Sequence, residues 1–339
     1  MADKRKIIMD VDTGSDDAVA LILAMTDPFY DLLGITSVNG NLEVKLTTEN
    51  SLRIVEFMGK QDTVKVYKGA DLPICSTLLP TTPQSLAPIP RREGSSIPEG
   101  LHHAAHIPTP SYTIREEEES AVEWLVETLL AADDGEITLV PVGPLTNIAL
   151  AMRADPRILP KIREIVIMGG TADRAGSKSM TAEFNIWIDP EALEIVLQSG
   201  CRITMVSLDA TFAAYITTAD AERIRSIGTK EADMVANLIL KYGTNAMLAE
   251  EKEKHIPIHD ALALYTVQCP EVLDAIETNV HCDISGGFAY GQTIVDRRDK
   301  RNNEDNCRFA LGADREMFVG WIIRTLEDAR DRGEHQLIR

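Results

Sequence analysis

From the N-terminus to Leu208, short β-rich runs alternate with longer amphipathic runs, and this alternation constrains the fold more than any other feature of the sequence. It is typical of strand–helix–strand units, which cover a mainly parallel sheet with helices. The expected strands are residues 6–12, 32–38, 64–67, 137–142, 165–168 and 203–208, and the expected helices are residues 16–25, 44–58, 120–132, 145–152 and 190–198. The pattern predicts an α/β fold with an open, mainly parallel twisted sheet of the Rossmann-like kind.

The sequence after Leu208 has a different pattern. It is mostly helical to Tyr265, then has two β-rich runs around Val280 and Ile294, and closes with a helical run over residues 315–330. We therefore expect additional C-terminal helices. A length of 339 residues fits one large α/β domain or two ordinary ones, and we interpret residues 1–339 as a single domain.

Residues 73–110 interrupt the alternation, because they hold eight of the sixteen prolines and show little periodicity. Loops of this length inside compact domains are usually functional or disordered. We interpret this segment as an active-site lid, with a passive surface excursion as the alternative.

Composition excludes several classes of partner. The 34 basic and 53 acidic side chains give a net charge of −19, which would repel a nucleic acid backbone. No apolar run is long enough to span a membrane, and the N-terminus lacks the apolar core of a signal peptide, so we expect a cytoplasmic protein. The five cysteines are scattered without a CxxC spacing, which indicates reduced thiols rather than a zinc or redox site.

Four carboxylates, Asp10, Asp12, Asp16 and Asp17, follow the first apolar run. They lie where a parallel sheet binds ligands, beyond the carboxyl end of a strand. Ser15 as a helix N-cap, with Asp16 and Asp17 near the positive end of the helix dipole, would account for two of the acids. Asp10 and Asp12 alternate on the strand and point the same way, so a cation is needed to offset their repulsion. Oxygen ligands favour calcium or magnesium over zinc.

Two known acidic motifs fit this stretch poorly. An EF-hand starting at Asp10 would need an oxygen ligand, glycine and glutamate at its fifth, sixth and twelfth positions, which hold Gly14, Ser15 and Leu21. A magnesium-dependent phosphatase of the Asp-x-Asp type would have glycine before threonine, whereas the order is Thr13-Gly14, and it has no use for a following pair of aspartates.

The pattern Asp-x-Asp-x-Gly-x-Asp-Asp-Ala at residues 10–18 resembles the opening of the inosine-uridine type nucleoside hydrolases, whose aspartates hold one calcium ion. Five later segments resemble the same family in the same order. They are Val-Asn-Gly-Asn at 38–41, Thr-Leu-Val-Pro-Val-Gly-Pro-Leu-Thr-Asn at 138–147, Ile-Val-Ile-Met-Gly-Gly at 165–170, Ala-Glu-Phe-Asn-Ile-Trp-Ile-Asp-Pro-Glu-Ala at 182–192 and Ile-His-Asp-Ala at 258–261. The resemblance covers about residues 6 to 330.

The resemblance implies calcium-dependent hydrolysis of ribonucleosides to a free base and ribose, by a homodimer or homotetramer. It implies that Asp12 is both general base and metal ligand, with the other metal ligands being Asp17, Asp260 and the carbonyl of Val142, and Asp10 behind them. The implied ribose contacts are Asp16, Asn41, Met168, Glu183 and Asn185. His259 is the candidate proton donor to the leaving base, since histidine titrates near neutrality, although it could instead stack on the base.

The sequence departs from the family pattern in three places. The lid reads Glu-Gly-Leu-His-His-Ala-Ala-His at 99–106 instead of a His-Gly-x-x-Gly-like motif, and residues 176–179 read Gly-Ser-Lys-Ser where many members have an asparagine near the ribose 5′ end. Upstream of His259, where some members place tyrosines over the base, residues 242–247 have Tyr242 as their one aromatic residue, so base preference does not transfer. Two other classes of function remain as alternatives: the Asp-x-Asp phosphatase, and a calcium-stabilised protein that binds nucleoside or ribose without turnover.

Overall fold

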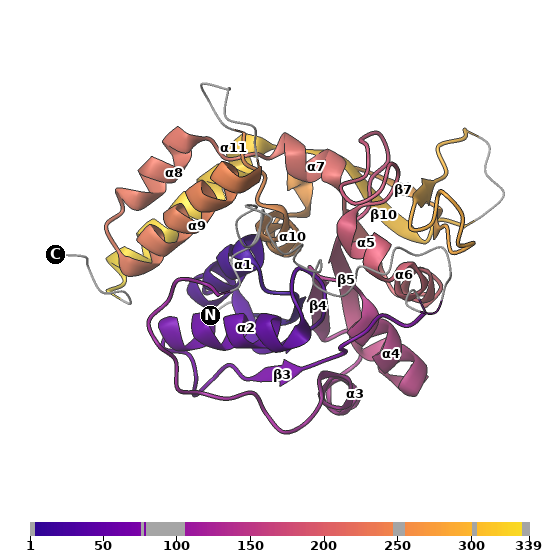
Figure 1. The fold of residues 1–339 in the computed structure, drawn as a ribbon, viewed down its shortest axis with the longest axis horizontal. Helices are drawn as coiled ribbons and strands as arrows, with labels where there is room; N and C mark the ends of the chain where they lie inside the picture. The colour runs from indigo at the N-terminus through magenta and orange to yellow at the C-terminus, as the bar shows by residue number, and fades with distance from the viewer. Residues whose placement is uncertain (1–3, 76–77, 79–105, 247–254, 300–303, 334–339) are drawn as a thin grey trace, which may run out of the picture.

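The computed structural model describes residues 4–75, 78, 106–246, 255–299 and 304–333. Its centre is an eight-stranded sheet in the order β3-β2-β1-β4-β5-β6-β10-β7 (Figure 1). The strands are β1 Arg5–Val11, β2 Tyr30–Ser37, β3 Val66–Lys68, β4 Ile137–Pro141, β5 Ile162–Met168, β6 Ile203–Val206, β7 Leu273–Thr278 and β10 Cys307–Ala313. All neighbouring strands are parallel except β7, which pairs antiparallel with β10. The predicted fold class is confirmed.

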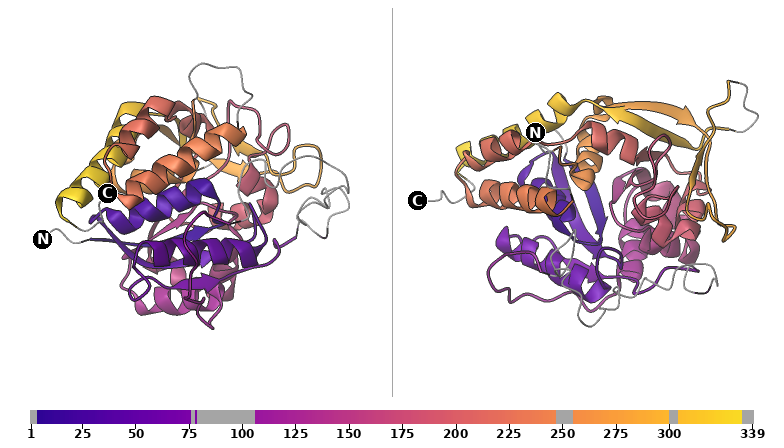
Figure 2. Two further views of the ribbon diagram at one scale, coloured as in Figure 1. Left: turned by 60° about the vertical axis from the view of Figure 1, so that its left-hand side comes forward. Right: turned by 45° about the horizontal axis from the view of Figure 1, so that its top comes forward.

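Helices cover both faces of this sheet. The α-helices are α1 Ser15–Thr26, α2 Val44–Phe57, α3 Ala121–Ala131, α4 Thr146–Ala154, α5 Phe184–Ile188, α6 Pro190–Leu197, α7 Leu208–Ala213, α8 Thr218–Arg225, α9 Lys230–Ala246, α10 His259–Gln268 and α11 Arg315–Asp331. Two 3₁₀ helices, η2 Pro156–Lys161 and η3 Pro270–Val272, precede β5 and β7. The expected C-terminal helices are present, and α8, α9 and α11 lie side by side (Figures 1 and 2).

The alternation of side chains along β1 explains the two layers. Ile7, Met9 and Val11 pack into one buried cluster with α1, α2 and the helices α8 to α11. Ile8 points the other way, into a second cluster with α3, α4 and α6. Successive residues of a strand face opposite sides of a sheet, and a parallel sheet is buried on both, so the apolar run of β1 is nearly continuous.

Two strands of the central sheet, β7 and β10, were missing from the sequence-based prediction. The β-rich runs around Val280 and Ile294 instead form β8 Val280–Cys282 and β9 Thr293–Val295, a separate two-stranded antiparallel sheet. Strand β10 reads Cys-Arg-Phe-Ala-Leu-Gly-Ala and β7 reads Leu-Asp-Ala-Ile-Glu-Thr, and neither is rich in β-branched residues. Their strand conformation depends on pairing with each other and with β6, which no local pattern reveals.

Both ends of the predicted lid are anchored by buried polar side chains. The Ile74 amide donates to Asp189 Oδ2 at 2.9 Å, and the Ile107 amide donates to Asn50 Oδ1 at 3.0 Å. Residues 76–77 and 79–105, with His102 and His103, lie outside the described residues. In the described part of the chain, no helix is long and apolar enough to cross a membrane.

Candidate active site

The carboxyl end of β1 and the first turn of α1 form the base of the site. Gly14, and not Ser15 as predicted, is the N-cap of α1. Asp17 bonds back to the loop, because its Oδ2 accepts from the Gly14 amide at 2.8 Å and its Oδ1 accepts from the Asp12 amide at 3.2 Å. Asp17 thus satisfies the N-cap amide that the helix leaves without a partner, and it also fixes the loop at Asp12.

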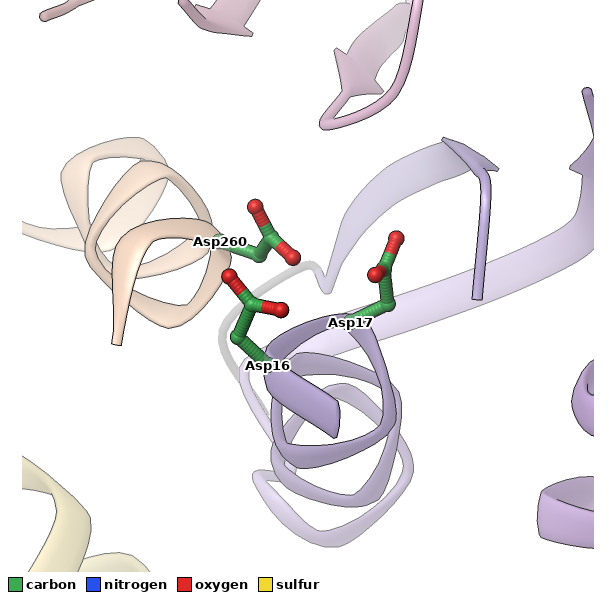
Figure 3. A group of neighbouring side chains, drawn as sticks. All are labelled: Asp16, Asp17 and Asp260. Atoms are coloured by element: carbon green, nitrogen blue, oxygen red, sulfur yellow. The ribbon is translucent and has the colours of Figure 1, made fainter. Parts of the chain in front are cut away.

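Asp260 joins this loop from a distant part of the sequence. It lies in the first turn of α10, which packs against α1. One carboxylate oxygen each from Asp16, Asp17 and Asp260 lies within 4.8 Å of the others, and the three side chains face a common space (Figure 3). All three are buried. The structure therefore brings together Asp17 and Asp260, as predicted, and adds Asp16, which was predicted to contact ribose.

Asp12 is fixed by the turn after β2. Its Oδ2 accepts from the Asn41 amide at 2.6 Å, and the Asn41 side chain lies 3.4 Å from Asp17 Oδ2. A Cβ atom on Gly40 would lie 2.2 Å from Asp12 Oδ2. Only glycine permits this approach, which explains the glycine in the Val-Asn-Gly-Asn turn.

Asp10 lies behind Asp12 and is held by residues that the sequence did not single out. Its Oδ1 accepts from Thr36 Oγ1 at 2.5 Å and from Asn147 Nδ2 at 2.8 Å. Asn147 also donates to the Ser37 carbonyl at 3.0 Å. The available signal for Asn147 was its position at the end of segment 138–147, which resembles the family.

The acidic side chains are buried, yet several of their carboxylate oxygens have no hydrogen-bond partner. Among the described residues, Asp10 Oδ2, Asp12 Oδ1 and Asp16 Oδ1 are buried without a hydrogen-bond partner. Burial raises the pKa of Asp10 and of Asp17 to about 7, and for Asp17 the charge of Asp16 adds to the effect. Burial, followed by neighbouring carboxylates, raises the pKa of Asp12 and Asp260 well above the ordinary value. Buried oxygens without donors suit a hard cation.

A second group of predicted residues converges beside the first. Asn185 Nδ2 donates to the Val142 carbonyl at 2.7 Å and lies 3.2 Å from the Met168 carbonyl. A Cβ atom on Gly143 would lie 3.0 Å from Asp12 Oδ1, so the turn after β4 passes directly beside Asp12. The residues predicted for metal and ribose thus gather where β1, β4 and β5 end.

Glu183 is both a helix cap and a member of this group. Its Oε1 accepts from the Asn185 amide at 2.9 Å, and its Oε2 accepts from the Gly170 amide at 3.2 Å. It caps α5, a short helix that the periodicity did not predict. Burial raises the pKa of Glu183 to about 7.

His259 is held by α7 at the other side of the site. Its Nδ1 lies 2.7 Å from Thr211 Oγ1, and its ring meets Phe212 edge-on, with centroids 5.6 Å apart. The Arg174 guanidinium lies 4.1 Å from the centre of the Phe212 ring. Thr211 and Phe212 were not predicted as site residues. The available signal was their position directly after β6, at the same sheet edge as the other candidates.

Asp209, also on α7, shapes the loop after β5. Its carboxylate accepts from three consecutive backbone amides, those of Ala172, Asp173 and Arg174, at 2.7 to 3.1 Å. This arrangement fixes the backbone that presents Arg174 to Phe212.

A comparison with protein families decides the relationship. The model of the inosine-uridine preferring nucleoside hydrolases matches residues 7–320. The chain belongs to this family. It is an enzyme, a nucleoside hydrolase, and the resemblance inferred from its motifs is confirmed.

Relatives of this nucleoside hydrolase include two named pyrimidine-specific ribonucleoside hydrolase RihB. One, from Escherichia coli O17:K52:H18 (strain UMN026 / ExPEC), is 34% identical over 94% of this chain and 96% of its own length. The other, from Shigella sonnei (strain Ss046), is 35% identical over the same shares.

Solved structures of nucleoside hydrolases have the same fold. A plant nucleoside hydrolase, PpNRh1, superposes with a TM-score of 0.82 at 26% identity, covering 96% of this chain and 99% of that one. A purine-preferring ribonucleoside hydrolase from Gardnerella vaginalis superposes with a TM-score of 0.80 at 26% identity and the same coverage.

Proposed function

We propose that this nucleoside hydrolase cleaves the N-glycosidic bond of ribonucleosides in a calcium-dependent reaction that releases a free base and ribose. The observation that carries the proposal is the buried cluster of Asp16, Asp17 and Asp260 beside Asp12. In it, Asp12 Oδ1 and Asp16 Oδ1 have no hydrogen-bond partner. The oxygen-only donor set fits calcium, which takes six to eight oxygens.

Asp12, Asp17, Asp260 and the Val142 carbonyl would hold the ion. The Val142 carbonyl already accepts from Asn185, and its second lone pair is the one it would offer to a cation. Asp16 lies within the same cluster, so it is a candidate for ribose binding and for the cation at once. When bound, calcium would align ribose hydroxyls with a water molecule and lower the pKa of that water.

Asp12 is the proposed general base. The Asn41 amide fixes one carboxylate oxygen, while Oδ1 has no donor and is the atom that would take the proton from water. Asp10, held by Thr36 and Asn147, would support it from behind.

The sugar would be bound by Asp16, Asn41, Met168, Glu183 and Asn185. Cleavage of the bond develops positive charge on the ribose, as in other glycoside hydrolyses. Carboxylates that are already fixed by backbone amides, as Glu183 is, stabilise such charge without reorganising. His259 would donate the proton that the leaving base needs.

No observation favours the phosphatase or the protein that binds without turnover. The chain's membership of a hydrolase family argues against the second, and the order Thr13-Gly14 argues against the first.

The test is a panel of purine and pyrimidine nucleosides assayed for reducing-sugar release, because relatives are named for both kinds of base. We expect release from at least one ribonucleoside, loss of that activity after chelation, and recovery with calcium. Full activity after exhaustive chelation, or recovery with zinc but not calcium, would contradict the proposal.

Three sequence-based interpretations remain predictions: a single domain over residues 1–339, a lid at residues 73–110, and a cytoplasmic homodimer or homotetramer. Asn50, which anchors Ile107, also donates to the Thr13 carbonyl in the acidic loop, and this supports a lid with one end near the site. Light scattering of the purified enzyme would test the oligomeric state, and a monomer would contradict it.

A further inference from the structure

His259 is the first residue of α10, and Thr211 lies on α7, which contacts α10. Thr211 is 1% exposed, and its hydroxyl lies 2.7 Å from His259 Nδ1. A buried hydroxyl at this distance forms a hydrogen bond with Nδ1 and thereby fixes the orientation of the ring. The contact is therefore part of the leaving-group side of the site.

The Thr211 hydroxyl can accept a hydrogen bond from Nδ1 of a protonated His259 ring. A protonated histidine donates from both nitrogens, so Nδ1 needs an acceptor. Thr211 Oγ1 can accept that bond while its own hydroxyl donates to the Leu208 carbonyl, 3.4 Å away and one turn earlier in α7. The same arrangement holds the ring after it becomes neutral, because Nδ1 keeps its hydrogen.

Phe212 restricts the ring in a second way. Its ring meets the imidazole at an interplanar angle of 70° with centroids 5.6 Å apart. Thr211 thus sets which nitrogen faces α7, while Phe212 limits rotation of the ring plane. Because Nδ1 faces Thr211, Nε2, the other nitrogen of the ring, is turned away from that hydroxyl.

We infer that Thr211 is a positioning residue that assigns proton donation to Nε2 of His259; this inference rests on the proposed function. In the step, the Nε2–H bond breaks and an N–H bond forms on the departing base, which keeps the electron pair of the broken C–N bond. Water supplies the hydroxyl for the ribose, and its proton goes to Asp12. Between turnovers, Asp12 releases its proton to solvent, and solvent restores the proton on Nε2.

The test compares Thr211→Val, which keeps the side-chain shape, with Thr211→Ser, which keeps the hydroxyl. Substrates are uridine or inosine, whose bases leave poorly, and para-nitrophenyl riboside, whose leaving group needs no proton. General acid catalysis is worth about 10² to 10⁴ in rate, so we expect Thr211→Val to lower kcat on nucleosides by about 10- to 100-fold. On the aryl riboside, kcat should fall by less than about threefold, with KM little changed on both substrates. Thr211→Ser should restore most of the loss.

Thr266→Val is the matched control, because Thr266 is also buried and donates to a carbonyl on α10, that of Leu262 at 2.9 Å, without contacting the site. It should leave kcat unchanged on both substrates. Equal losses on both substrates, no loss, or failure of serine to restore activity would overturn the inference.

A double-mutant cycle tests the inference without relying on any single variant. In a His259→Ala background, replacing Thr211 by Val or Ser should cost nothing further, because the residue acts only through the ring. Additive losses would overturn the inference. If the wild-type enzyme cleaves no riboside at all, the proposed function fails instead, and the two outcomes are distinct.

Discussion

The two sides of the candidate site differ in how firmly they are built. On the metal side, the side proposed to hold the cation, Asp12, Asp17 and Asp260 are at most 3% exposed, and backbone amides hold Asp12 and Asp17. On the leaving-group side, Phe212 is 37% exposed, and Arg174 lies over it from an exposed loop. The chemistry proposed to be common to all ribonucleosides thus has a rigid setting, whereas the side that would meet the base adds the exposed side chains of Phe212 and Arg174 to the buried Thr211.

This difference explains why the reaction class is easier to read from the residues than the base preference. Buried carboxylates that lie next to one another repel unless a cation or a proton intervenes, so few functions require them. An exposed phenylalanine with an arginine on its face can adapt to several bases.

The strongest test of the metal side is Asp12→Ala. We expect kcat to fall by about 10⁴-fold, since general-base catalysis and cation binding are both lost. The fold should persist, which circular dichroism and a melting curve would check. Asp62→Ala, on the surface, is the control and should have no effect. Turnover near that of the wild type would remove Asp12 from the role of base.

The corresponding test of the leaving-group side is His259→Ala. We expect a loss of about 10²- to 10³-fold on uridine or inosine, and a much smaller loss on an aryl riboside whose leaving group needs no proton. Steady-state kinetics on both substrates would measure this. Equal losses would mean that His259 binds the base rather than protonating it, and the contrast between the two sides would weaken.

Glu183→Gln tests the buried charge through stability. The pKa of Glu183 is about 7 in the folded protein against an ordinary value of 4.5. The folded state therefore binds a proton that the unfolded state releases, so its stability falls as pH rises from about 4.5 to about 7. Glutamine has no proton to lose. The variant should gain up to about 3 kcal/mol relative to the wild type across this window.

Chemical denaturation of both proteins at pH 5 and pH 8, in the same chelator, would measure this change. A stability difference that stays constant with pH would show that Glu183 is already ionised in the folded state.

The smallest expected effect concerns Phe212. An edge-to-face aromatic pair contributes about 0.5 to 1.5 kcal/mol beyond its area, so Phe212→Ala should change kcat/KM by no more than about tenfold. The ratio of purine to pyrimidine activity should shift more than the activity itself. An unchanged ratio across the nucleoside panel would place the base elsewhere.

Much of the site could be predicted because its residues follow strands with strong apolar patterns. Strand β1 was expected over residues 6–12 and observed as Arg5–Val11, so the position of Asp10 to Asp17 at its end was correct. Thr211 and Phe212 were not predicted as site residues, because they lie in a run that was interpreted only as helical. Their roles depend on α10 packing against α7, a contact between segments far apart in the sequence.

The same limit applies to the edge of the sheet. Strand β10 pairs with β6 and β7, so its conformation is decided by partners and not by its own composition. The predicted N-cap of α1 was wrong by one residue. Asp17, three residues after the N-cap Gly14, accepts from the Gly14 amide and makes a serine cap unnecessary.

The dependence of the acidic cluster on Asp260 has a consequence for synthesis of the protein on the ribosome. Asp16 and Asp17 emerge early, but α10 can dock on α1 only after most of the chain has left the exit tunnel. A nascent chain that ends before α10 therefore lacks one of the carboxylates proposed to hold the ion. Complete coordination of the cation would then come late in synthesis, after two segments far apart in the sequence have met.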